Sequence, residues 1–216
     1  MKKVIGVFLI SSILCIFTYN VTKNSKKNIL ALGDGLCLAN SIFNVEGYSF
    51  NYFIKDYYYK NKVLNNYNDE FCETNLTISE LHDLIIENKE INSQSIQYLL
   101  DNADLITLAI GFDELKSYSK ITNQIKKEFL NNYATLISNI MDLTNAQIVV
   151  VGYYPNYFKD ALEISKKMQA IVETRKLIFI NVEDLSQKKE FFYDLKHSNL
   201  NINGHKQIFN KIEPYL

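Results

Sequence analysis

The 216-residue chain has no tryptophan, only two prolines and seven glycines, and a net charge of −1. So little glycine and proline excludes a low-complexity block, and the sequence contains no internal repeat. Domains that bind nucleic acids usually carry a clear positive charge, and this chain does not, so no nucleic-acid partner is expected. Asparagine, lysine, isoleucine and tyrosine are abundant instead, a bias typical of AT-rich bacterial genomes. The length suits one domain with a sizeable core.

Cysteine is also scarce, and none of Cys15, Cys37 and Cys72 belongs to a CxxC motif or a Cys/His cluster. The sequence therefore gives no reason to expect zinc. Cys37 and Cys72 lie near the ends of the first two expected strands. They could form a disulfide, but two buried free thiols are the favoured expectation.

The first 27 residues are interpreted as an N-terminal signal-anchor with a short linker. Lys2 and Lys3 precede an uncharged run from Val4 to Val21, which is long for a signal-peptide core and short for a full span. No small-x-small cleavage site follows, so an uncleaved anchor is expected, with a cleaved signal peptide as the alternative. The expected location is the extracytoplasmic side of the cell membrane, or secretion in the alternative case.

From residue 28 to residue 216, apolar runs alternate with segments of helical periodicity. Two of these runs end in glycine, as buried parallel strands often do. This alternation predicts a three-layer α/β/α sandwich with about five parallel strands in the flavodoxin-like order 2-1-3-4-5. The expected strands are Asn28–Leu32, Glu70–Thr74, Asp104–Ile110, 147–154 and 177–182; the expected helices are Gly47–Tyr59, Ser79–Asn88, Ser93–Asn102, Ile121–Leu143, Ala161–Thr174 and Asn203–Ile212.

Ligands of such sheets bind beyond the carboxyl ends of the strands, so the residues that follow the strands are the candidate site. These are Asp34 and Gly35, Asn75, the segment Gly111–Glu114, Tyr153 and Tyr154, and the segment before the last helix.

At these positions the chain resembles the SGNH, or GDSL-type, hydrolases. The stretch "ALGDGLCLA" is similar to the first family block, "LITLAIGFDEL" to the block around Gly-x-Asn-Asp, and "HSNLNINGHKQI" to the block that opens the final helix. "GYYP" after the fourth strand is also typical. The resemblance implies an α/β/α fold and an esterase, lipase or carbohydrate-deacetylase ancestry.

The departures from the family pattern concern its catalytic residues. The resemblance places Gly35 where the family has its nucleophilic serine, Asn75 near the glycine of the oxyanion hole, and Asp113 at the oxyanion-hole asparagine. Aligning the last block on Gly204 puts Asn199 at the catalytic histidine. In a rival register, Asp194 and His197 keep the Asp-x-x-His pair as an oriented base.

These replacements remove the groups that acyl transfer requires. Glycine supplies no nucleophilic atom, an ionised aspartate cannot donate to an oxyanion, and asparagine does not relay protons. Function is therefore expected to be that of a binding or structural module at the cell surface. The alternative is an active esterase, acyl hydrolase or carbohydrate deacetylase that uses nonstandard residues.

The strand order would bring Asp34, Asp113 and Glu114 together beside Gly35. Three carboxylates could hold Ca²⁺ or Mg²⁺ or a cationic group, but the favoured interpretation is that Asp34 bonds nearby backbone amides and Glu114 faces solvent. No metal and no cofactor is therefore expected. Expected binding residues are these three with Tyr153 and Tyr154, and expected partners are the membrane, through the N-terminus, and a glycan or acyl-bearing ligand.

Overall fold

A computed structural model describes residues 25–39, 47–154, 160–193 and 199–216. Its main sheet has five parallel strands in the order β2-β1-β5-β6-β7. In chain order this is 2-1-3-4-5, so the predicted strand number, direction and order are confirmed. The strands are β1 (Lys27–Gly33), β2 (Leu64–Cys72), β5 (Leu105–Ala109), β6 (Gln147–Val151) and β7 (Ile178–Ile180).

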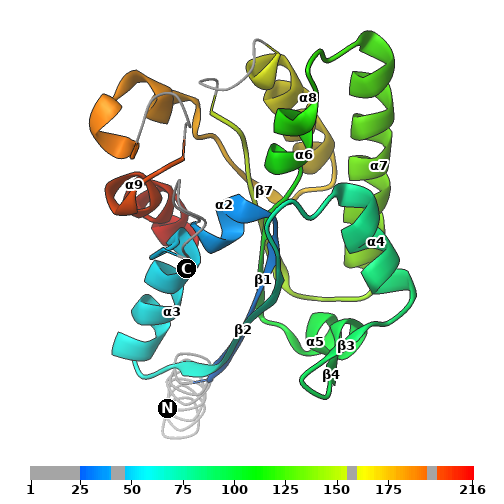
Figure 1. Cartoon of the computed structure of the whole chain (residues 1–216). Helices are drawn as coiled ribbons and strands as arrows, with labels where there is room; N and C mark the ends of the chain where they lie inside the picture. The colour runs from blue at the N-terminus through cyan, green and yellow to red at the C-terminus, as the bar shows by residue number, and fades with distance from the viewer. Residues whose placement is uncertain (1–24, 40–46, 155–159, 194–198) are drawn as a thin grey trace, which may run out of the picture.

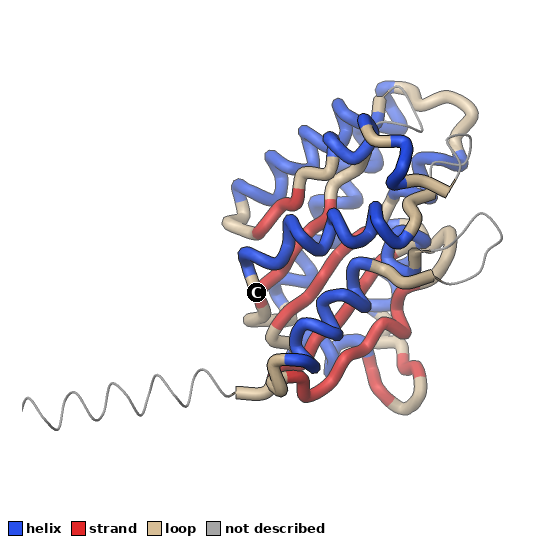
Figure 2. The backbone as a smooth tube through the Cα atoms, turned by 90° about the vertical axis from the view of Figure 1, so that its left-hand side faces the viewer, coloured by secondary structure: helices blue, strands red, loops and turns tan. Residues whose placement is uncertain are grey.

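Helices cover both faces of the sheet. On one face α3 (Phe50–Lys60) packs against α9 (Ile202–Ile212), and Figure 2 shows the strands running behind this layer. On the other face α7 (Asn123–Asp142) packs between α4 (Ile78–Ile86) and α8 (Ala161–Thr174), as Figure 1 shows. The shorter elements are α2 (Gly35–Leu38), α5 (Ile96–Asn102), α6 (Phe112–Ser117) and 3-10 turns at Glu183–Gln187, Lys189–Phe191 and Glu213–Tyr215.

The centre of the sheet is the most deeply buried part of the molecule. Every residue of β5 is buried, as a central parallel strand requires. α7 buries one stripe of its surface, at Phe129, Tyr133, Leu136, Ile137 and Ile140, which is the face that its sequence period predicts. This packing fixes the strand ends on which the site is built.

The end of β1 approaches β5 so closely that only glycine fits there. Gly33 has a φ of +153°, and an added Cβ atom would lie 1.9 Å from the Ala109 carbonyl oxygen. The next residue continues the contact, because the Asp34 amide donates to that oxygen at 2.9 Å. Asp34 is thereby held directly above the junction of the two strands.

The edge of the sheet beside β2 differs from the sequence prediction. β2 begins at Leu64 instead of Glu70, because its first half is polar and lacks the apolar pattern of a buried strand. A small antiparallel hairpin, β3 (Glu90–Ile91) and β4 (Gln94–Ser95), replaces the expected start of a helix at Ser93. Ser95 caps α5, which therefore begins at Ile96.

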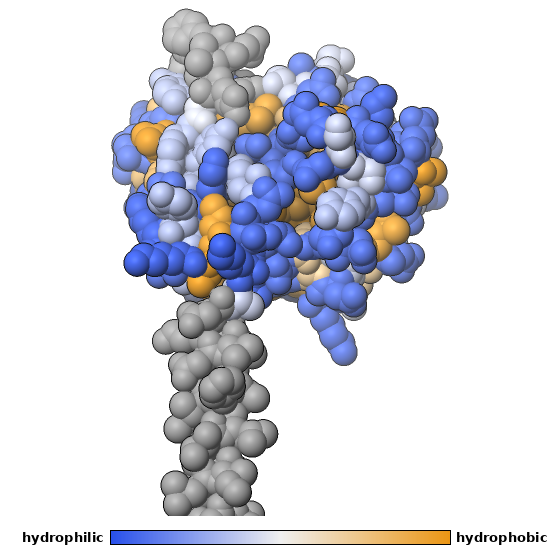
Figure 3. Space-filling view, turned by 90° about the horizontal axis from the view of Figure 1, so that it is seen from below, coloured by the Kyte–Doolittle hydropathy of each residue, from blue (hydrophilic) through white to orange (hydrophobic). Residues whose placement is uncertain are grey.

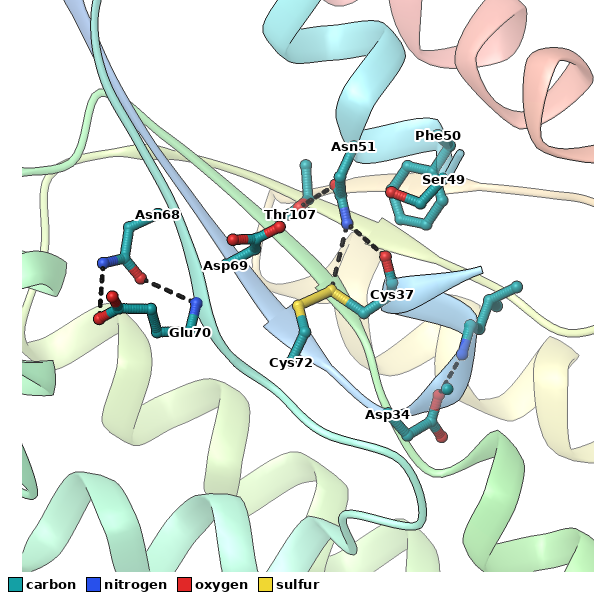
Figure 4. The surroundings of a disulfide bond; sticks show 12 residues. Asp34, Cys37, Ser49, Phe50, Asn51, Asn68, Asp69, Glu70, Cys72 and Thr107 are labelled. Atoms are coloured by element: carbon teal, nitrogen blue, oxygen red, sulfur yellow. Dashed lines mark hydrogen bonds between the residues drawn. A yellow bond between two sulfur atoms is a disulfide. The ribbon is translucent and has the colours of Figure 1, made fainter. Parts of the chain in front are cut away.

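The expectation of two free thiols is wrong, because a disulfide joins Cys37 to Cys72 (Figure 4). Cys72 pairs with Gly33 across β1 and β2, and Cys37 lies one helical turn beyond that point, so the Cα atoms are 5.8 Å apart. Asn51 Nδ2 donates to the Cys37 carbonyl oxygen at 3.2 Å, and its Oδ1 accepts from Thr107 of β5 at 2.7 Å. The disulfide and this amide thus fix α2 to β2, α3 and the central sheet.

The expected signal-anchor lies outside the described residues. Within residues 25–39, 47–154, 160–193 and 199–216, no helix combines the length and apolar character needed to cross a membrane.

Candidate functional site

The candidate site lies where β1 and β5 end and the short helices α2 and α6 begin (Figure 1). Asp34 is fully buried and caps α2, since its Oδ1 accepts from the Leu36 amide at 3.1 Å. Its Oδ2 accepts from the Asp113 amide at 3.0 Å. One carboxylate therefore fixes the first turns of two helices relative to each other.

Burial, reinforced by the neighbouring Asp113 carboxylate, raises the pKa of Asp34 from 3.8 to about 7. Backbone amides of Asp113, Leu36 and Phe112 oppose this rise by favouring the charged form. The group therefore titrates close to neutral pH, because desolvation outweighs its hydrogen bonds.

Asp113 occupies the centre of the site. Its Oδ2 accepts from the Gly35 amide at 2.9 Å and from the Asn75 amide at 3.2 Å. Its Oδ1 lies 3.5 Å from Lys116 Nζ, one turn further along α6. Asn75 has a left-handed backbone with a φ of 63°, a conformation that asparagine tolerates better than most residues. A single carboxylate oxygen thus fills a two-amide nest made by distant parts of the chain.

Gly35 leaves the space that this carboxylate uses. A Cβ atom at Gly35 would lie 2.6 Å from Asp113 Oδ2, below any ordinary contact distance. The glycine and the aspartate are therefore mutually compatible, and a side chain at residue 35 requires Asp113 to move.

The third expected carboxylate, Glu114, does not share this centre. Its Oε2 accepts from the Ile78 amide at 3.0 Å, at the start of α4, so the expectation that it faces solvent is wrong. Burial raises the pKa of Glu114, and the hydrogen bond from Ile78 lowers it. The favoured interpretation of Asp34, as an acceptor for nearby backbone amides, agrees with the structure. Among the described residues, no three metal-ligating side chains form a group that could hold a metal ion.

A pocket of about 260 Å³ opens beside Gly35 and Asp113. Asn199, which the resemblance places at the catalytic histidine, lies in its wall, and so does His205 of α9. The His205 ring is buried, which lowers its pKa to about 3, and its Nδ1 accepts from the Phe50 amide at 3.4 Å. It is a neutral residue that joins α9 to α3. The other lining residues are Leu36, Ala39, Thr74, Asn75, Phe112, Lys116, Tyr154 and Leu200.

The two tyrosines after β6 have different positions. The Tyr153 ring is in the core, and its hydroxyl donates to the Ile110 carbonyl oxygen at 2.6 Å, so it does not line the pocket. Tyr154 does line the pocket, with its ring 4.9 Å from that of Phe112 and 5.5 Å from that of Phe192. The rival pair, Asp194 and His197, lies outside the described residues.

Sequence reasoning missed Lys116 and the contribution of the Asn75 backbone. The spacing from Asp113 to Lys116 is that of neighbours on one helical face, and it is the only signal in the sequence for this ion pair. The role of the Asn75 backbone amide cannot be recognised in the sequence, because every residue except proline has a backbone amide.

The five-stranded parallel sheet and its strand order match the α/β/α fold of the SGNH hydrolases. Known structures of this class are similar over most of the chain. A lipase/acylhydrolase from Enterococcus faecalis has a TM-score of 0.64 at 14% identity, covering 88% of this chain and 94% of that one. The acetylxylan esterase Axe2 from Geobacillus stearothermophilus, in a catalytic-mutant form, gives 0.64 at 12% identity with the same coverages. A member of the lipolytic G-D-S-L family from Veillonella parvula gives 0.56 at 11% identity, covering 86% of this chain and 96% of that one.

These similarities establish the fold and not the activity. No family model matches the sequence, and no curated protein matches it.

Proposed function

We propose that the chain is a catalytically impaired SGNH-like domain that serves as a binding module at the cell surface. The observation that supports this most strongly is the place of the Asp113 carboxylate, which accepts both the Gly35 and the Asn75 amide. By the family resemblance, Asn75 lies near the oxyanion-hole glycine and Asp113 at the oxyanion-hole asparagine, so this carboxylate lies where the donors to the oxyanion of an acyl-transfer intermediate would be.

A carboxylate in this nest has two consequences for ester hydrolysis. It occupies donors that would otherwise stabilise a developing negative charge, and the loss of one such donor costs roughly 10²–10³ in kcat. It also places a fixed negative charge where an oxyanion would form, and two like charges at that distance repel. Gly35 adds no nucleophile, and Asn199 adds no general base.

A pocket is present beside Gly35 and Asp113, which favours a binding function over the loss of all function. It combines amide, hydroxyl and amine groups with the rings of Phe112 and Tyr154, the mixture that orients a small polar ligand. A glycan or an acyl-bearing molecule is the proposed ligand, and the esterase and lipase names of the neighbouring structures agree with that choice.

The proposed location is the extracytoplasmic side of the membrane, with the apolar run from Val4 to Val21 as the anchor. The Cys37–Cys72 disulfide supports this location independently of the N-terminal sequence, because disulfides persist in oxidising compartments and are rare in the bacterial cytoplasm.

The test is an esterase and deacetylase screen of the full-length protein. The substrates are p-nitrophenyl esters of several chain lengths, acetylated xylo-oligosaccharides and acetylated chito-oligosaccharides. We expect no turnover above that of the His197→Ala variant, which removes the candidate base of the rival register. Turnover that purifies with the wild-type protein and disappears in His197→Ala would replace this proposal with an unorthodox hydrolase.

A further inference from the structure

A second pocket lies at the opposite end of the sheet, beside the amino ends of β1 and β2. Its volume is about 280 Å³, and it is bounded by the two strands, the β3–β4 hairpin and α5. This end of the molecule is seen from below in Figure 3, where hydrophilic residues cover most of the visible surface. The pocket shares no lining residue with the one beside Asp113.

The polar side chains of this pocket are almost all amides. Among the described residues that line it, none is charged. Its polar residues are Asn28, Asn65, Asn66, Asn68, Gln94 and Asn102, together with Tyr98.

Hydrogen bonds hold most of these amides in place. Asn28 Oδ1 accepts from Asn65 Nδ2 at 2.8 Å, and its own Nδ2 donates to the Asn102 carbonyl oxygen at 2.9 Å. Asn68 is more than nine-tenths buried, accepts from the Glu70 amide at 3.2 Å and donates to Gln94 Oε1 at 3.4 Å. These side chains are therefore oriented before any ligand arrives, which lowers the entropic cost of binding.

Other polar groups of the pocket are accessible to a ligand. Asn66 lies across the sheet from Asn28, and within the described part of the chain its side-chain amide has no hydrogen-bond partner. Tyr98 exposes 57% of its surface at the rim on α5. The pocket thus presents amide donors and acceptors next to an accessible aromatic ring.

The polar sequence of β2 supports a role for this surface. Asn66 and Asn68 pair with Asn28 and Leu30 of β1, at positions that a covering helix would normally require to be apolar. α5 and the β3–β4 hairpin leave the pocket open above this part of the sheet.

We propose that this pocket binds a neutral saccharide through one sugar ring. Amides both donate and accept, as sugar hydroxyls do, whereas the uncharged lining offers no ion pair to an anionic or cationic ligand. The exposed ring of Tyr98 can stack against the apolar face of a pyranose. The volume lies just below the usual range of ligand pockets, roughly 300–1,000 Å³, which suits one ring better than a long chain. A peptide is less well matched, because the pocket opens on the side-chain face of β1 and β2 and not on the free edge of β2.

The test is saturation-transfer NMR on the full-length protein with four neutral disaccharides: maltose, cellobiose, xylobiose and diacetylchitobiose. Galacturonic acid and the peptide Ala-Asn-Ala serve as charged and peptide comparisons. We expect transfer to at least one neutral disaccharide, with binding about fivefold weaker, or ~1 kcal/mol, in Asn66→Ala and in Tyr98→Ala. Both substitutions remove exposed side chains, so folding is preserved.

Two control variants separate this site from the rest of the surface. Asn131→Ala removes an exposed amide on α7, and Lys116→Ala alters the pocket beside Asp113. Asn131→Ala should bind the disaccharide as the wild type does. The weakening caused by Asn66→Ala and by Tyr98→Ala should persist in the Lys116→Ala background, where any additional loss reports binding in the pocket beside Asp113. No transfer to any neutral disaccharide, transfer only to galacturonic acid or the peptide, or a loss caused by Lys116→Ala and not by Tyr98→Ala would overturn the inference.

Discussion

Gly35 and Asp113 depend on each other, and this dependence is the main chemical feature of the site. The aspartate carboxylate receives the Gly35 amide and lies where a Cβ atom at residue 35 would be. The missing side chain at residue 35 and the carboxylate in the amide nest are therefore coupled features of this site.

This dependence predicts non-additive stability effects. Gly35→Ser should destabilise the protein by ~1–3 kcal/mol, because the new side chain crowds Asp113. Asp113→Ala should destabilise it by a similar amount, because two amides lose their acceptor. In the double variant the space is free, so the total cost should be at least ~1 kcal/mol less than the sum of the two. Urea unfolding of the four proteins measures the coupling, and a purely additive double variant would show that the two residues act separately.

A pH dependence follows from Asp34. Its pKa is about 7 in the folded protein and about 3.9 in the unfolded chain. Between these values the folded state holds the proton more tightly, so the free energy of unfolding falls as pH rises through this window. The stability contributed by the protonated Asp34 carboxyl is fully present at a pH below its unfolded-state pKa and is lost at a pH above its folded-state pKa.

The measurement compares wild type with Asp34→Asn, which has no titration at this position. We expect the stability of the wild type relative to Asp34→Asn to decrease steadily from about pH 4 to about pH 8. Asp142→Asn, at an exposed position of α7, is the matched control. A constant difference between wild type and Asp34→Asn over this range would mean that the pKa of Asp34 is not raised.

At the residue scale, the sequence predicted which positions meet at the site but not how their side chains are bonded. The strand ends identified Asp34, Gly35, Asn75 and Asp113 because the carboxyl ends of parallel strands converge. Which amide each carboxylate accepts depends on rotamers and on the path of the loop at Asn75, and neither leaves a pattern in the sequence. The same limit explains why Glu114, adjacent to Asp113, was expected in solvent but bonds the start of α4.

At the scale of elements, prediction succeeded where burial imposes a pattern and failed where it does not. β5 and α7 follow the periods of a fully buried strand and an amphipathic helix. β2 lies at the sheet edge, and its polar first half faces a pocket, so it has no such pattern. The Cys37–Cys72 pairing also could not be decided from the sequence, because the strand order alone does not give the register of β2 against β1 or the path of α2.

The disulfide should stabilise the junction of α2 and β2. Its cysteines are separated by 35 residues. The chain-entropy model gives ~4 kcal/mol for a loop of about that length. We expect Cys37→Ala/Cys72→Ala to lose about this much stability, and dithiothreitol to weaken the wild type similarly. Cys15→Ser is the matched control and should unfold like the wild type. Wild-type unfolding that does not respond to dithiothreitol would indicate that the pair is not oxidised in the purified protein.

At the scale of the whole molecule, the sequence accounts for nearly all of the architecture. The alternation of strands and helices, combined with right-handed crossovers, permits few arrangements, and the observed order β2-β1-β5-β6-β7 is the one expected. At this scale, a shared fold does not imply a shared activity. Structures of lipases and acetylxylan esterases share the fold at 12–14% identity, while the residues that would perform their chemistry are decided locally.

The last prediction joins the N-terminal segment to the disulfide. If the N-terminal segment anchors the domain outside the cytoplasm, the protein should remain with the membrane fraction. Protease should also digest the domain in cells whose envelope is permeabilised but whose cytoplasmic membrane is intact. Cys37 and Cys72 should then be oxidised in the cell, because export exposes them to an oxidising compartment.

Thiol trapping tests the redox state directly in the same cells. After acid quenching and denaturation, a maleimide-polyethylene glycol should label only Cys15; prior reduction should add the labels of Cys37 and Cys72. A cytoplasmic protein of known thiol content reports leakage in both assays. A domain that is digested only after the cytoplasmic membrane is broken, with all three cysteines labelled before reduction, would place the protein inside the cytoplasm. The outcome thus depends on two independent features, the topology of the N-terminal segment and the redox state of the Cys37–Cys72 pair, and an extracytoplasmic location predicts both results.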